Sequence, residues 1–435
     1  MKKKSFYSYL RVSACICGLF LSAGCQTPKE TKEAHRAVGD YFAGDFPRAI
    51  QRLEPLSKKT DENYVLNNLR LGSASLVSYD LDDAESAFLR AWEVINAGGV
   101  NSGSRAVAAT WVSEKLKIWK GEPYERALAS FYLGLVYDMR GDLDNARAAY
   151  ENALFKLRDY ASDKQQKKED FSQQESTFVL AYIMLGRAWQ RLGRDDLAQQ
   201  QFDEAIKLQP QIAPLADANL WRRSNVLLAV DYGYGPKMIT TDYGDSVVGF
   251  RPLPHEAGPI PLPSVTVDNK LYPLGAANQP TIDTLAMAQD RRWQSIDTIR
   301  TVKNVVGTGM MVGGAGYGLY KLGEGNFNGT DAAIAGGLLA AGALLQASSH
   351  ADVRQWEMVP RSVFLLPLSL PPGQHTITVF FPQTGLQQTW QALPVPQHGD
   401  AIFYFRMNRY WPGPFIFAPA VPPAATAFTP EKTSE

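Results

Sequence analysis

The sequence predicts an α+β protein, in which an N-terminal all-α solenoid of helical repeats precedes a small antiparallel β-sandwich-like domain interrupted by a glycine-rich helical hairpin. Three observations predict this class. A helical motif recurs in one frame through the first half. Apolar runs of strand length dominate the second half, with no helix between most consecutive runs. Two uncharged stretches rich in glycine and alanine lie between those runs.

Residues 1–24 have the pattern of a secretory signal: a lysine-rich start, a short apolar core and small residues before Cys25. The cysteine after those small residues makes the segment resemble the bacterial lipoprotein signal, the lipobox, although Leu21 lies four positions before it, not the usual three. The resemblance implies cleavage after Gly24, acylation of Cys25 and a lipidated tether over 25–30. The alternative is a plain secreted protein with a chance cysteine. A lipobox leaves one cysteine in the mature chain, which excludes an internal disulfide.

Residues 31–215 are expected to form the helical repeats. One frame fits 65–98, 127–160 and 179–210, with a weaker copy near 31–60. Small residues at two positions of each unit let two antiparallel helices approach closely, and large residues fill the space between successive pairs. This spacing matches the 34-residue tetratricopeptide pattern. The packing residues are Leu71, Gly72, Ala84 and Phe88, then Leu133, Gly134, Tyr137, Ala146 and Tyr150, then Leu185, Gly186, Trp189, Ala198, Phe202 and Pro210.

The concave surface of such a solenoid has two interpretations. It grips a peptide or helix of a partner, the habitual use of these repeats, or it is a scaffold without a ligand. Tyr64, Tyr124 and Tyr182 fall near the starts of repeats, where first-helix residues often face the concave side, although they also suit contacts between repeats.

The second half has a different composition. Residues 216–280 combine strand-like runs with many prolines, and residues 356–411 contain four further runs that complete the C-terminal domain. The last 24 residues, 412–435, are rich in proline and alanine, which predicts a disordered tail.

Residues 281–355 are expected to form an amphipathic helix and then a helical hairpin over 305–349. Small residues recur four apart, which lines one helix face and permits close backbone contact. We expect a hairpin that packs on itself or on other copies of the chain, or one that inserts into a bilayer as a pore or export component. The packing residues are Gly309, Gly313, Gly314, Gly318, Ala333, Gly337 and Ala341.

Two distinctive segments, Gly121–Arg126 and Ala351–Trp356, carry a further resemblance, joined by Val359-Pro360 and Leu370–His375. With the lipobox, the repeats and the glycine-rich section, the chain resembles a poorly characterised family of bacterial tetratricopeptide lipoproteins. The resemblance implies this architecture and no activity.

Charge and motifs limit the function classes. The 44 basic and 44 acidic residues balance, and loss of residues 1–24 with their four basic residues leaves 40 against 44, so no basic face for nucleic acid is expected. His255-Glu256 lacks the second histidine of a zincin. We expect no catalytic residue, cofactor or metal, and no enzyme; the alternative is that scattered carboxylates meet and act on an envelope substrate.

Together these observations predict a lipid-anchored protein of the bacterial outer membrane, facing the periplasm. The resemblance to the Gram-negative lipoprotein family implies that destination, because the cysteine is followed by Gln26 and not by aspartate. The expected partners are envelope proteins on the repeat surface, the membrane through the lipid and residues 305–349, and other copies of the chain.

Overall fold

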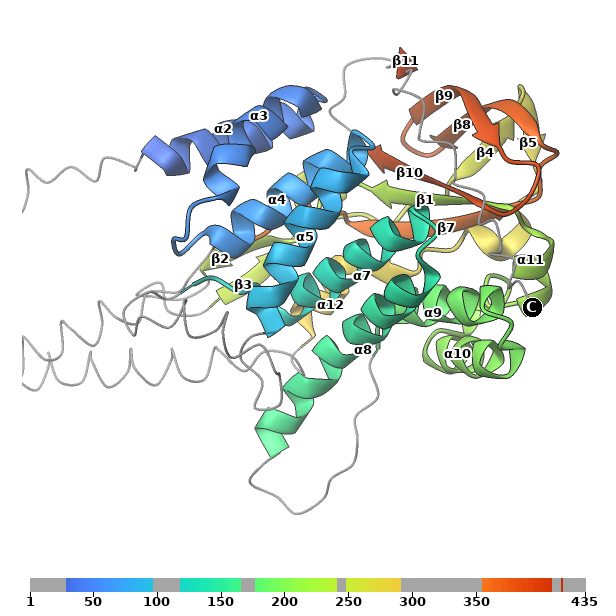
Figure 1. The fold of residues 1–435 in the computed structure, drawn as a ribbon, viewed down its shortest axis with the longest axis horizontal. Coiled ribbons are helices and arrows are strands. Elements are labelled where there is room, and N and C mark those ends of the chain that lie inside the picture. Colours follow the sequence, from blue (N-terminus) through green and yellow to red (C-terminus); the bar gives the residue numbers. More distant parts are fainter. Residues whose placement is uncertain are drawn as a thin grey trace, which may run out of the picture.

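The computed structural model describes residues 29–96, 118–165, 177–240, 248–290, 354–408 and 416–417. Cys25 with its signal, and the expected hairpin over 305–349, lie outside the described residues. Within them, a layer of paired helices packs on one sheet, and a second sheet covers the opposite face of the first (Figure 1).

Helical repeats form the N-terminal half, as the sequence predicts. Consecutive helices pack against one another from the first pair to the last. The pairs are α2 (Lys29–Phe42) with α3 (Phe46–Ser57), α4 (Tyr64–Val77) with α5 (Leu81–Asn96), α7 (Pro123–Met139) with α8 (Leu143–Gln165), and α9 (Val179–Arg191) with α10 (Asp195–Leu208).

A glycine on the first helix faces an aromatic ring on the second in three of these pairs. A Cβ added at Gly72 would lie 2.8 Å from the Phe88 ring, and one at Gly134 would lie 2.7 Å from the Tyr150 ring. At Gly186 the distance to the ring of Phe202 would be 2.6 Å. The paired helices therefore approach to a separation that only a hydrogen side chain allows.

The other predicted packing residues lie on the helices of these pairs or, in the case of Pro210, just after the last of them. Leu71, Leu133, Leu185, Ala84, Ala146 and Ala198 are buried. Tyr137 and Trp189 are half-buried, with the Arg147 guanidinium 4.7 Å from the centre of the Trp189 ring. Pro210 begins a 3-10 helix, η1 (Pro210–Ile212), and a short helix α11 (Ala218–Arg223) then leads into the first strand.

The first sheet has the strand order β10-β1-β7-β6. Every residue of the three long strands is buried, which is typical of a sheet covered on both faces. The strands are β1 (Val226–Tyr232), β6 (Ile282–Asp283), β7 (Ser362–Leu368) and β10 (Ala401–Met407).

The second sheet has the order β11-β9-β8-β4-β5, and buried residues of β8 and β9 largely alternate with partly or fully exposed ones, as in strands with one solvated face. Trp390 and Phe381 of this sheet contact rings of the first sheet, Phe405 and Phe364. The strands are β4 (Ser264–Val267), β5 (Lys270–Tyr272), β8 (Gly373–Phe381), β9 (Leu386–Val395) and β11 (Ile416–Phe417).

Smaller elements complete the described chain. A separate hairpin pairs β2 (Lys237–Thr240) with β3 (Val248–Arg251). Two 3-10 helices, η2 (Pro254–Glu256) and η3 (Gly275–Asn278), flank β4 and β5, and the short helix α12 (Thr284–Gln289) follows β6.

The expectation of a purely antiparallel sandwich is wrong in two places. β1 pairs with β10 in parallel, with Val226 opposite Ala401, and β11 pairs with β9 in parallel. The chain leaves the first sheet after β7, forms β8 and β9 in the second, and returns as β10 beside β1; such a long connection allows parallel pairing.

Two expected boundaries also differ. Ile282 belongs to strand β6 opposite Val363, not to the expected amphipathic helix. The short helix α12 begins at Thr284, where the Asp283 carboxylate accepts the Ala286 N–H at 3.0 Å, and ends at Gln289; the rest of the expected helix lies outside the described residues. Ile416 and Phe417 fall in the tail predicted to be disordered, yet they pair with β9, whose outer edge otherwise presents unpaired backbone groups.

Gly186→Ala tests the close helix approach. We expect a loss of about 1–3 kcal/mol in the free energy of unfolding, because the new methyl group overlaps the buried Phe202 ring. The matched control is Gly39→Ala in α2, where nothing lies within 4 Å of an added Cβ and alanine should stabilise the helix by about 0.5–1 kcal/mol. Urea denaturation of both variants measures the difference; equal stabilities would contradict this packing.

Candidate functional site

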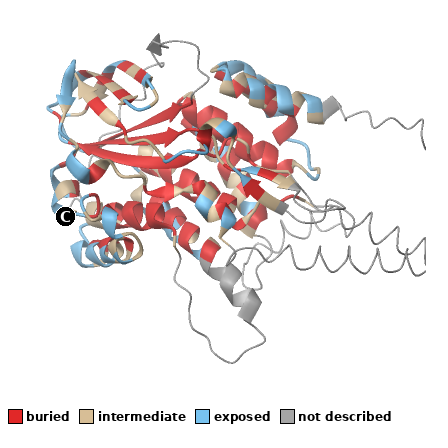
Figure 2. Cartoon of the chain, turned by 180° about the vertical axis from the view of Figure 1, so that it is seen from behind, coloured by how far each residue is buried: buried red, intermediate tan, exposed pale blue. Residues whose placement is uncertain are grey.

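The face formed by the first helices α4, α7 and α9 is the candidate site, because it corresponds to the concave surface of the repeats. Every residue of α4 is buried, whereas α10, a second helix, buries only Ala198, Phe202 and Ala205 (Figure 2). Both α4 and α7 contact β10. Strand β10 of the first sheet thus lies against the α4 and α7 part of this face, and Tyr64, Tyr124 and Tyr182 are buried, with at most 9% of each exposed.

Tyr79 joins α4 to the outer edge of β10. Its hydroxyl accepts the Tyr404 N–H at 2.7 Å and donates to the Tyr404 carbonyl at 2.9 Å. Tyr79 has φ 59°, and it is the second residue after α4, the position that glycine occupies after α2, α7 and α9. A positive φ is unfavourable for a non-glycine residue. The two hydrogen bonds that Tyr79 forms with the edge of β10 offset this conformational cost.

A polar cluster lies inside the junction between helices and sheet. The Asp231 Oδ2 of β1 accepts hydrogen bonds from the hydroxyls of Tyr132 on α7 and Tyr404 on β10, both at 2.6 Å. Arg406 of β10 is fully buried and Asp231 is 1% exposed. Burial raises the pKa of Asp231 to about 6, against the opposing effects of the Arg406 charge and the two hydroxyls.

A second set of contacts holds the extended segment just before β7 against α4 and α7. The buried Trp356 ring packs edge-on against the rings of Phe88 and Tyr132, and its Nε1–H donates to the Ser73 hydroxyl at 3.1 Å. Its backbone N–H donates to Glu125 Oε1 at 2.6 Å. Trp356 and Glu125 belong to the two segments that carry the family resemblance, so tertiary folding brings those segments together.

Charged groups fix the same segment on either side of Trp356. The Arg70 guanidinium binds both oxygens of Glu357, at 2.6 and 2.9 Å, in a bidentate pair. Arg354 donates to the Glu62 carbonyl at 2.9 Å, and its own carbonyl accepts from Trp119 Nε1 at 3.0 Å. Residues 354–357 therefore occupy the part of the helical face that a partner peptide would otherwise contact.

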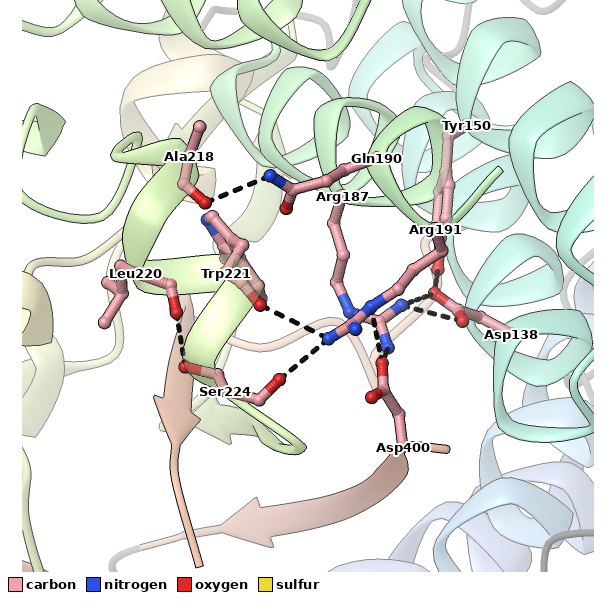
Figure 3. Close-up of polar contacts among 10 residues, drawn as sticks. All are labelled: Asp138, Tyr150, Arg187, Gln190, Arg191, Ala218, Leu220, Trp221, Ser224 and Asp400. Carbon is pink, nitrogen blue, oxygen red and sulfur yellow. Dashed lines mark hydrogen bonds and ion pairs between the residues drawn. The ribbon is translucent and has the colours of Figure 1, made fainter. Parts of the chain in front are cut away.

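The far end of the junction is a buried ion network (Figure 3). Arg187 of α9 donates to both oxygens of Asp138 on α7, at 2.8 and 2.6 Å, and to Asp400 just before β10 at 3.0 Å. Arg191 reaches Asp400 at 2.6 Å and the Ser224 carbonyl at 2.8 Å. The Arg187 and Asp138 side chains are only 3% and 1% exposed, so both charges lose their contact with water. The ion pair and its hydrogen bonds must therefore offset the cost of burying the two charges.

Sequence reasoning placed the repeat residues but missed this junction. Asp231 and Arg406 each interrupt an otherwise apolar strand, and a charged residue inside a buried run is the signal that would have marked them. Gly24, Cys25 and the seven expected hairpin residues, Gly309 to Ala341, lie outside the described residues.

Neither a metal centre nor a membrane span is found in the described parts of the chain. The residues described there contain no group of three or more histidine, cysteine, aspartate or glutamate side chains arranged to hold a metal ion. No helix among them combines the length and the apolar character needed to cross a bilayer.

Comparison with known proteins adds little to this geometry. No protein-family model matches the chain, and no curated protein matches it. Among solved structures it is similar to the MamA protein, with 24% identity, a TM-score of 0.20, and coverage of 42% of this chain and 93% of MamA. A Rap protein complexed with competence and sporulation factor shares 16% identity, with a TM-score of 0.20, 44% of this chain covered and 56% of Rap. Because these TM-scores are so low, the two similarities carry no argument. The assignment of helical repeats therefore depends on the helix pairs seen in this chain.

Arg187→Met tests the ion network. Removal of the guanidinium leaves the buried Asp138 carboxylate uncompensated, which should lower the free energy of unfolding by about 3–5 kcal/mol. The control is Arg194→Met, because the Arg194–Asp196 pair is solvent-exposed and its loss should leave stability unchanged within error. Urea denaturation measures both variants. A small effect of Arg187→Met would show that the network does not stabilise the junction.

Glu125→Gln tests the buried carboxyl beneath Trp356. Burial raises the pKa of Glu125 from 4.5 to about 8, although two backbone N–H groups oppose the shift. The folded chain therefore keeps this proton where the unfolded chain releases it. The free energy of unfolding should fall as pH rises from about 4.5 to 8 by up to about 1.4 kcal/mol per pH unit.

The amide cannot titrate, so Glu125→Gln should flatten that dependence. Urea midpoints measured between pH 5 and 8 compare the two chains. An unchanged slope in the variant would mean that Glu125 is ionised in the folded protein across this range.

Proposed function

We propose that this chain is a lipid-anchored scaffold of the bacterial outer membrane, facing the periplasm, that assembles envelope proteins and is not an enzyme. One observation carries the proposal: the inner face of the repeats holds the chain's own sheet and the Trp356 segment. The repeats and sheets share one continuous apolar core, so they form a single rigid support. Partner proteins would then contact the outer helices and the segments between the repeats.

The outer helices suit that role. Charged residues are exposed along α10, where only one stripe is buried, and α8 presents Phe155 with 46% of its surface exposed. Among the described residues, Phe155 and Leu271 are the large hydrophobic side chains that are exposed, and aromatic side chains are enriched in protein–protein interfaces. We therefore propose that partners bind the convex side of the repeats and not the concave side.

The alternative function, membrane insertion or pore formation through residues 305–349, has one supporting observation. Helix α12, which ends just before residue 291, contacts α7, and Trp356, just after residue 353, bonds to Glu125 of α7. Both ends of the intervening segment are therefore held on one helix, as a hairpin requires.

Site-specific photo-crosslinking in bacterial cells tests the scaffold. A photoreactive residue replacing Phe155 should form adducts with envelope proteins, whereas one replacing the buried Tyr132 should form none, because the sheet covers that position. Mass spectrometry identifies the adducts. Adducts from Tyr132 with Phe155 silent would return the partner site to the inner face.

The same assay with Cys25→Ala tests the anchor. Without the cysteine the precursor should remain uncleaved, incorporate no labelled palmitate and leave the outer-membrane fraction, so that the Phe155 adducts disappear. If Cys25→Ala still incorporates palmitate and fractionates with that membrane, the lipobox assignment is wrong. This result is independent of whether the Phe155 adducts persist.

A further inference from the structure

The segment Leu370–His375, one of the stretches that carry the family resemblance, connects β7 to β8 and includes the first residues of β8. Asn225 fixes its start, because the Asn225 Oδ1 accepts the Leu370 N–H at 2.9 Å and Nδ2 donates to the Leu370 carbonyl at 2.8 Å. The next four residues, Pro371–Gln374, are all exposed. His375 at the end of the segment is buried. An exposed turn therefore lies between two fixed residues.

His375 forms contacts through both of its ring nitrogens. Its Nδ1 lies 2.7 Å from the Oδ2 of Asp268, in the turn between β4 and β5, and its Nε2 lies 2.9 Å from the Pro371 carbonyl oxygen. An ionised carboxylate and a carbonyl only accept hydrogen bonds, and a neutral imidazole has a single N–H. Both contacts are therefore hydrogen bonds only when the ring is doubly protonated. In that state His375 ties the β4–β5 turn to the β7–β8 turn.

The position of the His375 ring requires these partners. The ring lies on the buried face of β8 together with Ile377, where a polar side chain is costly without hydrogen bonds. Burial by itself lowers the pKa of a histidine, but the hydrogen bonds to Asp268 and Pro371 and the Asp268 charge raise the pKa of His375 above 6.5. The Asp268 carboxylate also accepts the Thr376 N–H at 2.9 Å, and the bonds from Thr376 and His375 lower the pKa of Asp268, so it stays ionised.

Asp268 is the charged group that acts directly on His375 in the described part of the chain. Lys270 on β5 is exposed, and its charge favours the ionised form of Asp268. The hydroxyl of Tyr272, also on β5, accepts a backbone N–H just after β7 at 2.8 Å. On β9 the residue opposite His375 is Leu393, which is buried and uncharged. The protonation of His375 is therefore governed by one carboxylate.

We propose that His375 is a pH-sensitive clasp: the doubly protonated ring holds the β7–β8 turn closed, and loss of one proton to solvent releases this turn. The neutral ring keeps its N–H on Nδ1, because the charged Asp268 carboxylate is a stronger acceptor than a carbonyl. The lone pair of Nε2 then faces the Pro371 carbonyl oxygen, and two acceptors repel each other. The exposed turn moves away, while its start stays bound to Asn225.

The direction of the switch follows from the raised pKa of His375. The folded chain binds this proton more tightly than the unfolded chain does. The clasp is therefore complete below about pH 6.5, and it is lost as the pH rises through the higher pKa of the folded chain. The stability that the clasp contributes is lost over the same range.

Nuclear magnetic resonance of the purified full chain, labelled with 15N, tests the clasp between about pH 6 and 9. Ring nitrogen signals distinguish the doubly protonated ring from each neutral form, and His375→Gln identifies this ring among the five histidines. We expect the doubly protonated form to predominate at pH 6.5 and the Nε2 proton to leave at higher pH. Backbone order parameters of Gly373 and Gln374 should fall with the same midpoint, from about 0.85 toward 0.6. A ring that is already neutral at pH 6.5, or a turn whose order parameters do not change with pH, overturns the proposal.

Asp268→Asn is a variant that should lock the turn. Asparagine tolerates the φ of 50° at this position, and its side-chain carbonyl can still accept the Thr376 N–H. Its amide N–H then faces the Nδ1 of His375, so the ring becomes neutral, places its N–H on Nε2 and keeps the bond to Pro371 across the pH range. The order parameters of the turn should therefore stay high.

Asp203→Asn on the exposed face of α10 is the matched control and should behave like the unchanged chain. An Asp268→Asn chain whose turn still loosens as the pH rises contradicts the clasp. The titration of the unchanged chain decides the proposal even if Asp268→Asn fails to fold.

Discussion

The burial of both faces of the β10-β1-β7 sheet is the constraint on which the rest of the structure depends. One face packs on α4 and α7, and the other face packs on the rings of Trp390 and Phe381 in the second sheet. A polar side chain in these strands has no access to water, so each must find a partner within the protein. Asp231 therefore takes two tyrosine hydroxyls, and Arg406 lies in the same cluster as its counter-charge.

This constraint changes the meaning of the helical repeats. In an isolated array the first helices would present an open surface to a partner, but here α4 and α7 bury that surface against β10 and the Trp356 segment. The contacts at this face combine an aromatic anchor, a bidentate Arg70–Glu357 pair and bonds to backbone groups, which are the elements of peptide recognition used within one chain. The two segments of the family resemblance meet at this anchor.

The junction also couples folding to protonation. Burial raises the pKa of both Glu125 and Asp231, whereas the Arg406 charge and two tyrosine hydroxyls act against that shift at Asp231. Arg187 adds ion pairs with Asp138 and Asp400 at the other end of the junction.

The sequence by itself determined the local units, because their signals come from residues close in the chain. Gly72 and Phe88, Gly134 and Tyr150, and Gly186 and Phe202 recur at one spacing, which marked each helix pair, and the apolar runs marked β1, β7, β8, β9 and β10. Only the tertiary structure decided that β10 lies parallel to β1, that Tyr79 caps its edge, and that His375 contacts Asp268. These contacts join residues separated by 100 or more positions, and no sequence periodicity links such distant partners. They form because burial of the first sheet brings the elements that carry them together.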